Sequence, residues 1–140
     1  MENHTLRLFS EVLMARFVSY NANPAGNNAI DCTVRAISTA LDLSWDEVYE
    51  GVCRWGAILK NMPSADAVWG QYLRSMGFRR YVVPCRDDPC TVQDFCDEHP
   101  RGVYILCVHQ HVICVIDGCY LDTWDSGGEY PIYYWKKREA

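Results

Sequence analysis

The spacing of apolar residues changes once along the chain, close to Gly77. Before this point apolar residues recur every three or four positions, which is the period of an amphipathic helix. After it, short runs rich in β-branched and aromatic residues alternate with turn-forming residues, which is typical of strands. Helices followed by strands favour an α+β domain over alternating βαβ units. We therefore expect N-terminal helices packed on a C-terminal antiparallel β-sheet.

The part of the chain before Gly77 predicts four helices. They are expected over residues 4–15, 32–41, 44–60 and 63–76, with a short extended piece at 16–20 and a loop of turn-forming residues at 21–28. Asp31 is a good N-cap residue for the helix at 32–41. Ser44 and Glu47 have the form of a capping box for the next helix.

The remainder of the chain predicts strands separated by short turns. Strands are expected at 78–83, 103–108, 111–116, 120–124 and 130–135, with one short helix that Thr91 and Asp94 cap and that ends before Pro100. His109–Gln110 and Asp117–Gly118 are expected to form turns between successive strands. The basic residues at 136–138 are expected to form a short solvated tail.

Length and composition restrict the class of protein. A chain of 140 residues fits one domain, 1–140, in which we treat residues 1–20 as an N-terminal extension. No apolar run approaches the roughly 20 residues of a membrane-spanning helix, so no membrane partner is expected. The net charge of -5 argues against a nucleic-acid partner, because such binding draws on clustered lysine and arginine.

Cysteine usage indicates a reducing compartment. The chain has eight cysteines, but its N-terminus lacks the features of a secretion signal, so a cytoplasmic location with mostly free thiols is expected. Cysteines at 53, 96, 107, 114 and 119 are expected to be buried apolar side chains. Cys32 differs from them, because it follows a polar loop and begins a predicted helix.

Cys32, His111 and Asp122 have the positions that nucleophilic catalysis requires. A helix N-terminus lowers the pKa of a cysteine thiol, which is the first requirement for a thiolate nucleophile. His111 opens a predicted strand beside a turn, where its imidazole can accept the thiol proton. Asp122 lies on the following strand and is the candidate for orienting that imidazole. Asp125 competes for this role, but Asp122 is preferred because it shares a strand face with Trp124.

These segments carry a resemblance to a known family. Asp-Cys-Thr-Val-Arg-Ala-Ile at 31–37, His-Val-Ile-Cys-Val-Ile-Asp-Gly at 111–118 and Leu-Asp-Thr-Trp at 121–124 resemble the papain-like cysteine peptidase superfamily. Within it, the bacteriocin-processing peptidase domains of bacterial exporters look closest, which suggests a small bacterial or phage member. The resemblance implies a papain-like fold with Cys32 as nucleophile, His111 as general base and acid, and Asp122 as the orienting group.

The resemblance also implies a side-chain amide that stabilises the oxyanion from a position shortly before the nucleophile. Papain has glutamine six residues upstream, whereas this chain has Gly26 there. Asn23, Asn27 and Asn28 are the available replacements, and Asn27 is preferred for its spacing. Trp124 is expected in the core, where it would shield the orienting hydrogen bond as the similar tryptophan does in papain-like enzymes.

The predicted function is a thiol hydrolase, most simply a cysteine peptidase or isopeptidase acting on a peptide or protein without a cofactor. The same triad suits a deamidase or an acyltransferase, which differ only in leaving group and acceptor. A non-catalytic binding or inhibitor protein on the same fold is the alternative from another class. A zinc site built from Cys85, Cys90, His109 and His111 lacks the usual ligand spacing, so no metal is expected.

Overall fold

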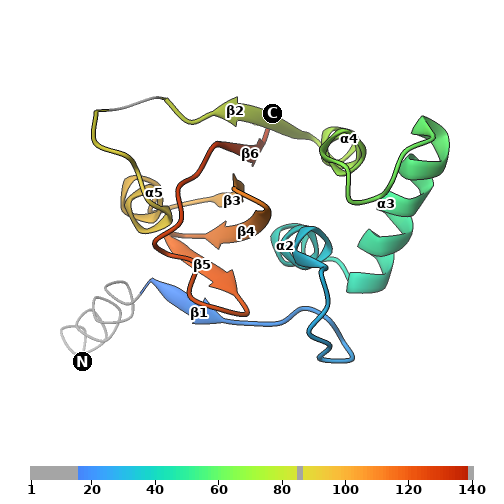
Figure 1. The fold of residues 1–140 in the computed structure, drawn as a ribbon, viewed down its shortest axis with the longest axis horizontal. Helices are drawn as coiled ribbons and strands as arrows, with labels where there is room; N and C mark the ends of the chain where they lie inside the picture. The colour runs from blue at the N-terminus through green and yellow to red at the C-terminus, as the bar shows by residue number, and fades with distance from the viewer. Residues whose placement is uncertain (1–15, 85–86, 139–140) are drawn as a thin grey trace.

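The fold, described for residues 16–84 and 87–138 of a computed structural model, has helices on both faces of a six-stranded mixed sheet (Figure 1). The helix predicted over 4–15 lies outside the described residues. The helices are α2 (Cys32–Leu41), α3 (Trp45–Leu59), α4 (Asp66–Ser75) and α5 (Val92–Glu98). The strands are β1 (Phe17–Ser19), β2 (Phe78–Val82), β3 (Val103–Val108), β4 (His111–Ile116), β5 (Cys119–Asp122) and β6 (Tyr133–Lys137). The α+β class expected from the sequence is confirmed.

The sheet is mixed, which corrects the expectation of a purely antiparallel one. Its order is β1-β5-β4-β3-β6-β2, and every neighbouring pair is antiparallel except β1 and β5. Phe17 pairs with Tyr120 and Ser19 with Asp122 in the parallel direction. The long chain between these two strands permits this direction, because parallel neighbours need an extended crossover. Residues 17–19 therefore belong to the sheet rather than to an N-terminal extension.

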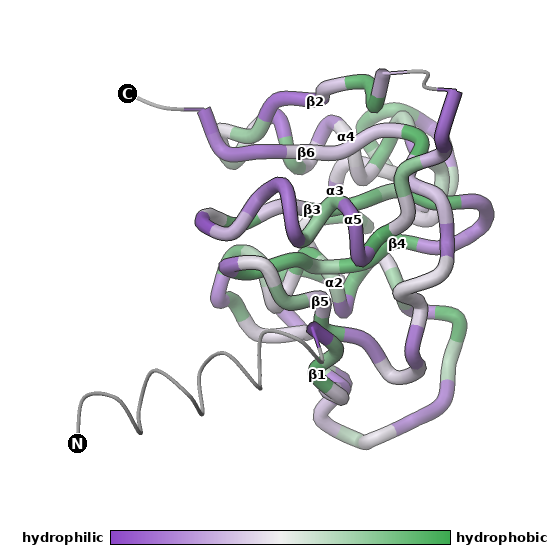
Figure 2. Tube along the Cα trace, turned by 90° about the vertical axis from the view of Figure 1, so that its left-hand side faces the viewer, coloured by the Kyte–Doolittle hydropathy of each residue, from purple (hydrophilic) through white to green (hydrophobic). Residues whose placement is uncertain are grey.

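Two apolar clusters lie on opposite faces of the sheet. One is formed by α2, α3 and α4 against the sheet, with Ile37, Leu73 and Trp135 among its buried residues. The other lies under α5 and includes Phe95 and Tyr120. Figure 2 shows the corresponding apolar stretches in the central strands. The described residues include no helix with the length and apolar character that crossing a bilayer requires.

Local sequence signals located most of the element boundaries. Ser44 accepts a hydrogen bond from the Glu47 backbone N–H, and Thr91 forms a reciprocal capping box with Asp94. Gln110, Asp117 and Gly118 have positive φ angles, as the tight turns that flank β4 require.

The boundaries of α4, β5 and β6 differ from the sequence-based expectation by two or more residues, and β5 ends at Asp122 rather than at 124. α4 begins at Asp66 rather than at Pro63, because a turn that joins Met62 to Ala65 precedes it. β6 begins at Tyr133 rather than at 130 and continues into the basic segment, where Lys136 pairs with both Arg79 and Tyr104. Residues 136 and 137 are therefore part of the sheet and not a solvated tail.

Gly51 lies inside α3, where alanine would normally stabilise the helix by about 1 kcal/mol. A Cβ added there would lie 2.5 Å from Cε2 of Tyr72, whose side chain is buried between α3 and α4. We expect Gly51→Ala to lower the free energy of unfolding by about 1–2 kcal/mol, because overpacking outweighs helix propensity. Urea unfolding measures this change. Gly128→Ala, where a Cβ meets no atom within 4 Å, is the control, and a stabilised Gly51→Ala would contradict the packing argument.

Candidate active site

Cys32 is the first residue of α2 and borders a pocket of about 420 Å³. The first backbone N–H groups of a helix have no intrahelical partner, so the pocket receives the positive end of α2. His111, the first residue of β4, and Tyr133, the first residue of β6, also border the pocket. Packing of α2 on β4 in the same core cluster brings the cysteine and the histidine together, although they are 79 positions apart in the sequence.

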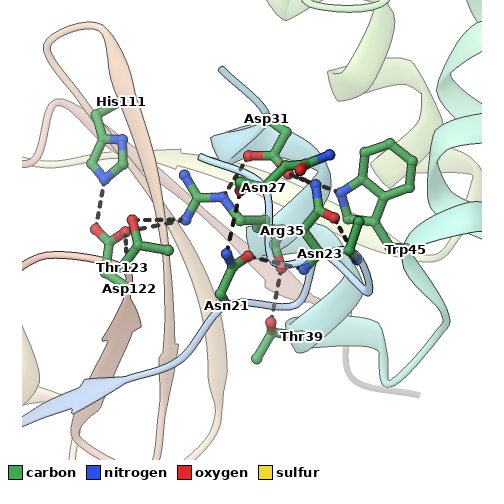
Figure 3. A network of polar contacts seen from close by, with 11 residues as sticks. Asn21, Asn23, Asn27, Asp31, Arg35, Thr39, Trp45, His111, Asp122 and Thr123 are labelled. Atoms are coloured by element: carbon green, nitrogen blue, oxygen red, sulfur yellow. Dashed lines mark hydrogen bonds and ion pairs between the residues drawn. The ribbon is translucent and has the colours of Figure 1, made fainter. Parts of the chain in front are cut away.

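His111 connects Cys32 to Asp122. Its Nε2–H donates to Oδ2 of Asp122 at 2.6 Å (Figure 3), while on its other side the ring faces the Cys32 thiol closely enough for each group to shift the pKa of the other. Because Nε2 is occupied by the carboxylate, Nδ1 is the nitrogen that remains for the thiol. The Asp122 carboxylate is almost fully buried and also accepts hydrogen bonds from the Ser126 hydroxyl at 2.7 Å and the Thr123 backbone N–H at 2.8 Å. The imidazole is therefore held by a carboxylate that is itself fixed.

The site favours a thiolate and an imidazolium. Burial acts to raise the pKa of the Cys32 thiol, but hydrogen bonds from His111, from the Val112 backbone N–H and from Thr33, together with the charge of His111, hold this pKa below its ordinary value. Burial acts to lower the pKa of His111, yet the hydrogen bonds and charges of Asp122 and Cys32 raise it to about 9. The two shifts have opposite signs, as expected when a proton moves from the thiol to the ring.

Arg35 links the two ends of the site through buried carboxylates (Figure 3). Its Nε donates to Oδ1 of Asp31 at 2.7 Å, and its Nη1 donates to Oδ1 of Asp122 and to Oγ1 of Thr123, both at 3.4 Å. Asp31 also accepts from Nδ2 of Asn23 at 3.1 Å and from Nε1 of Trp45 at 3.0 Å. Asp31 occupies the N-cap position of α2, but its side chain makes no capping hydrogen bond, because Arg35, Asn23 and Trp45 use its oxygens instead.

The asparagines predicted to stabilise an oxyanion do not border the pocket. Asn23 is buried, with its amide nitrogen on Asp31 and its amide oxygen on the Ala25 backbone N–H. Asn27 and Asn28 are exposed on the loop before α2. The amide residue that does border the pocket is Gln110, in the turn between β3 and β4.

The other candidates are separated by the fold. Asp125 is turned away from His111 and accepts hydrogen bonds from the Tyr120 hydroxyl and the Gly127 backbone N–H. Trp124 was expected in the core, but the structure places it at the surface. It is 45% exposed, and its ring centroid lies 5.0 Å from that of His111, so it covers the imidazole from the solvent side.

The residues considered for a zinc site lie apart, and three of the five cysteines expected to be buried are buried. Cys90 lies in the apolar cluster under α5, away from His109 and His111 at the pocket, and Cys85 lies outside the described residues. Among residues 16–84 and 87–138, no three His, Cys, Asp or Glu side chains form a group that could hold a metal ion. The cysteines at 96, 107 and 114 are buried as expected, whereas those at 53 and 119 are half-buried.

Sequence reasoning missed Arg35 and Gln110. Arg35 follows Asp31 by one helical turn, and this spacing indicates an ion pair. It gives no sign of the second contact, which joins Arg35 to Asp122 at the end of β5. The sequence indicates only a turn at Gln110. Its position in the loop next to His111 is the available signal, because loop residues held by a rigid scaffold often border a site.

Comparisons with protein-family models, with curated proteins and with solved structures find no match to this chain.

Proposed function

We propose that this protein is a papain-like thiol hydrolase, most simply a cysteine peptidase or isopeptidase, with Cys32 as nucleophile, His111 as general base and acid, and Asp122 as orienting group. The observation that carries the proposal is the placement of Cys32, the first residue of α2, at one pocket with His111, whose ring is hydrogen-bonded to the buried Asp122. Nucleophile, base and orienting group in that order are the requirements of acyl transfer by a thiol.

In the proposed reaction the Cys32 thiolate attacks the acyl carbon, and the negative charge moves to the carbonyl oxygen. Backbone N–H groups in the first turn of α2 and the side chain of Gln110, a residue that borders the pocket, are the proposed donors to that oxygen. His111 then donates its proton to the leaving amine, and the thioester forms as the amine departs. Water attacks the thioester, His111 accepts its proton, and the Cys32 thiolate is released with the carboxylic acid.

The pocket walls favour an acyl group with an apolar side chain. Trp69, Val108 and Ile132 form part of the walls, and the fully exposed Ile30 stands at the rim next to Cys32. Apolar walls with a few polar groups are typical of sites that orient a ligand by burial. A peptide with an apolar residue on the acyl side of the cleaved bond is therefore the proposed substrate.

The test of the proposal is the alkylation rate of each cysteine by iodoacetamide between pH 4 and pH 9, read by peptide mass spectrometry. We expect Cys32 to react rapidly below pH 7, because the neighbouring imidazolium stabilises its thiolate. In His111→Ala the rate at pH 6 should fall by about tenfold or more, since burial of the thiol remains while its hydrogen bond is lost. Cys53 and Cys119, the other half-buried thiols of the described chain, are internal references.

Equal rates at Cys32, Cys53 and Cys119 in the wild type, unchanged in His111→Ala, would refute the activated pair. That result would favour the binding-protein alternative, in which the cleft holds a ligand without chemistry.

Gln110 and Asn27 make a matched pair for the oxyanion donor. Gln110→Ala should lower kcat/KM for an activated ester by about tenfold to a hundredfold, because a donor that borders the pocket is removed. Asn27→Ala should change it by less than about twofold, because Asn27 is exposed and does not border the pocket. The reverse order of effects would restore Asn27 as the donor. Steady-state hydrolysis of p-nitrophenyl acetate measures both variants.

A further inference from the structure

A second hollow, of about 580 Å³, lies at the opposite end of α4 from the Cys32 pocket. Asp66, at the start of α4, borders the Cys32 pocket, while Arg74, in its last turn, borders this hollow. Ten helical residues separate the two ends by about 15 Å. The hollow is therefore a separate site, and its residues take no part in the proposed hydrolysis. Its lining consists of Arg74, Gly77, Phe78, Arg79, Arg80 and Arg138.

The hollow concentrates positive charge in a chain whose net charge is -5. Six of the thirteen lysines and arginines lie on the last turn of α4, on β2 and at the end of β6. The register of the sheet places Arg79 directly opposite Lys136, a pairing of like charges that destabilises a sheet. Figure 2 shows the hydrophilic ends of β2 and β6 side by side. The fold therefore keeps these cations close together although their mutual repulsion destabilises the sheet.

The four arginines of the lining have no acidic partner among the residues that the structure describes. Within residues 16–84 and 87–138 the lining has no carboxylate, and none of these arginines forms an ion pair with an aspartate or glutamate. The nearby backbone acceptors are also in use, because the Gly77 carbonyl accepts from the Arg138 backbone N–H at 2.7 Å and the Arg74 carbonyl from the Gly77 N–H at 3.1 Å. The guanidinium groups remain available to an external anion.

Aromatic rings hold three of these guanidinium groups in place. The guanidinium carbon of Arg74 lies 5.1 Å from the Trp135 ring centroid, that of Arg80 lies 5.2 Å from Tyr133, and that of Arg79 lies 5.9 Å from Tyr81. Such stacking restricts a long side chain without cancelling its charge. Pre-ordered arginines lose less conformational entropy when an anion binds, which is a property of a binding site rather than of a solvated surface.

We propose that this hollow binds a compact ligand with two or more linked phosphate groups. Planar guanidinium groups match the geometry of phosphate oxygens. Consecutive residues of β2 point to opposite faces of the sheet, so Arg79 and Arg80 border the hollow from opposite sides, and an anion that reaches both needs several charges. The volume suits a small molecule. No aromatic side chain in the lining is exposed for stacking on a base, because Phe78 is buried. Recognition should therefore depend on the phosphate chain, whether it is inorganic or part of a nucleotide.

Isothermal titration calorimetry of the full chain with inorganic tripolyphosphate tests the proposal. We expect binding at 50 mM NaCl that weakens at 300 mM NaCl, because exposed charges are screened. ATP should bind within about threefold of tripolyphosphate, and AMP at least about tenfold more weakly, since the phosphate chain supplies the contacts. The double variant R79Q/R138Q should lose at least about tenfold in affinity for tripolyphosphate. ATP binding far more tightly than tripolyphosphate would overturn recognition of the phosphate chain and indicate a site for the base.

Matched variants separate this site from general charge and from the proposed hydrolase. R54Q removes an exposed cation from α3 and should leave the affinity unchanged. R74Q, on a different element, should repeat the loss seen in R79Q/R138Q, and Cys32 alkylation should be unchanged in all of these variants. Absence of binding, equal losses in R54Q and R79Q/R138Q, or tighter binding of a polyglutamate peptide or an oligonucleotide would overturn the proposal.

Discussion

Replacing Cys32 with alanine should lower kcat/KM for p-nitrophenyl acetate by about 10³-fold or more. The remaining rate constant should equal that of the unfolded protein with the same ester. This is the largest change that we expect for activity, because the variant removes the atom that bonds to the acyl group. Cys32→Ser should retain less than about 1% of the wild-type value, because a hydroxyl next to His111 is a much weaker nucleophile than the thiolate. Stopped-flow absorbance at 400 nm follows release of the phenolate on the order of milliseconds to seconds.

The other half-buried thiols provide the controls for this measurement. Cys53→Ala and Cys119→Ala should hydrolyse the ester at the wild-type rate, because these residues lie on α3 and at the start of β5 and do not border the pocket. Equal rates for the wild type and Cys32→Ala would exclude the thiol hydrolase class. The basic hollow and its phosphate ligand would be unaffected by that outcome.

The pH profile for hydrolysis of a peptide p-nitroanilide, whose amine leaving group needs a proton, follows from the two shifted pKa values. The rate should rise with pH as the Cys32 thiol ionises, at a pH below that of an ordinary thiol. It should fall again near pH 9, because His111 loses the proton that the leaving group requires. In His111→Gln the falling limb should be lost and the rising limb should move to higher pH, because the group that lowers the pKa of the Cys32 thiol is gone, and most of the rate should be lost. A wild-type rate that keeps rising through pH 10 would show that the ring does not act as an acid.

Arg35→Met should lower the free energy of unfolding by about 3–5 kcal/mol, which is the largest effect on stability that we expect. The side chains of Asp31 and Asp122 are only 8% and 1% exposed, and Arg35 is the cation that contacts both. Removing it leaves the buried Asp31 carboxylate without a positive partner and leaves Asp122 with His111 alone. Arg35→Lys should recover less than half of the loss, because one ammonium cannot reproduce the fork that reaches both acids. Urea unfolding followed by tryptophan fluorescence measures each variant.

A second substitution distinguishes charge from packing at this position. In Arg35→Met/Asp31→Asn the uncompensated charge of Asp31 is removed, so the double variant should be more stable than Arg35→Met alone. A loss of less than about 1 kcal/mol in Arg35→Met would mean that the bridge behaves as a solvated surface pair. Either result is independent of whether Cys32 is catalytic.

The sequence by itself determined the class of the fold and the three residues of the candidate triad. The change of apolar period near Gly77, the caps at Ser44 and Thr91 and the turns beside β4 are local signals, and the structure has the elements that they predict. Cys32 at a helix start and Asp122 on the strand after His111 could be identified in the same way, because each position depends on neighbours a few residues away.

Only the tertiary structure decided which distant groups meet. The parallel pairing of β1 with β5, the contact of Arg35 with Asp122 and the place of Gln110 at the pocket join residues far apart in sequence, and no period or spacing encodes such contacts. The sequence predicts a solvated tail at 136–138, whereas pairing with β2 places this segment beside other arginines. Local signals choose helix or strand, whereas the packing of apolar faces chooses which ends of those elements come together.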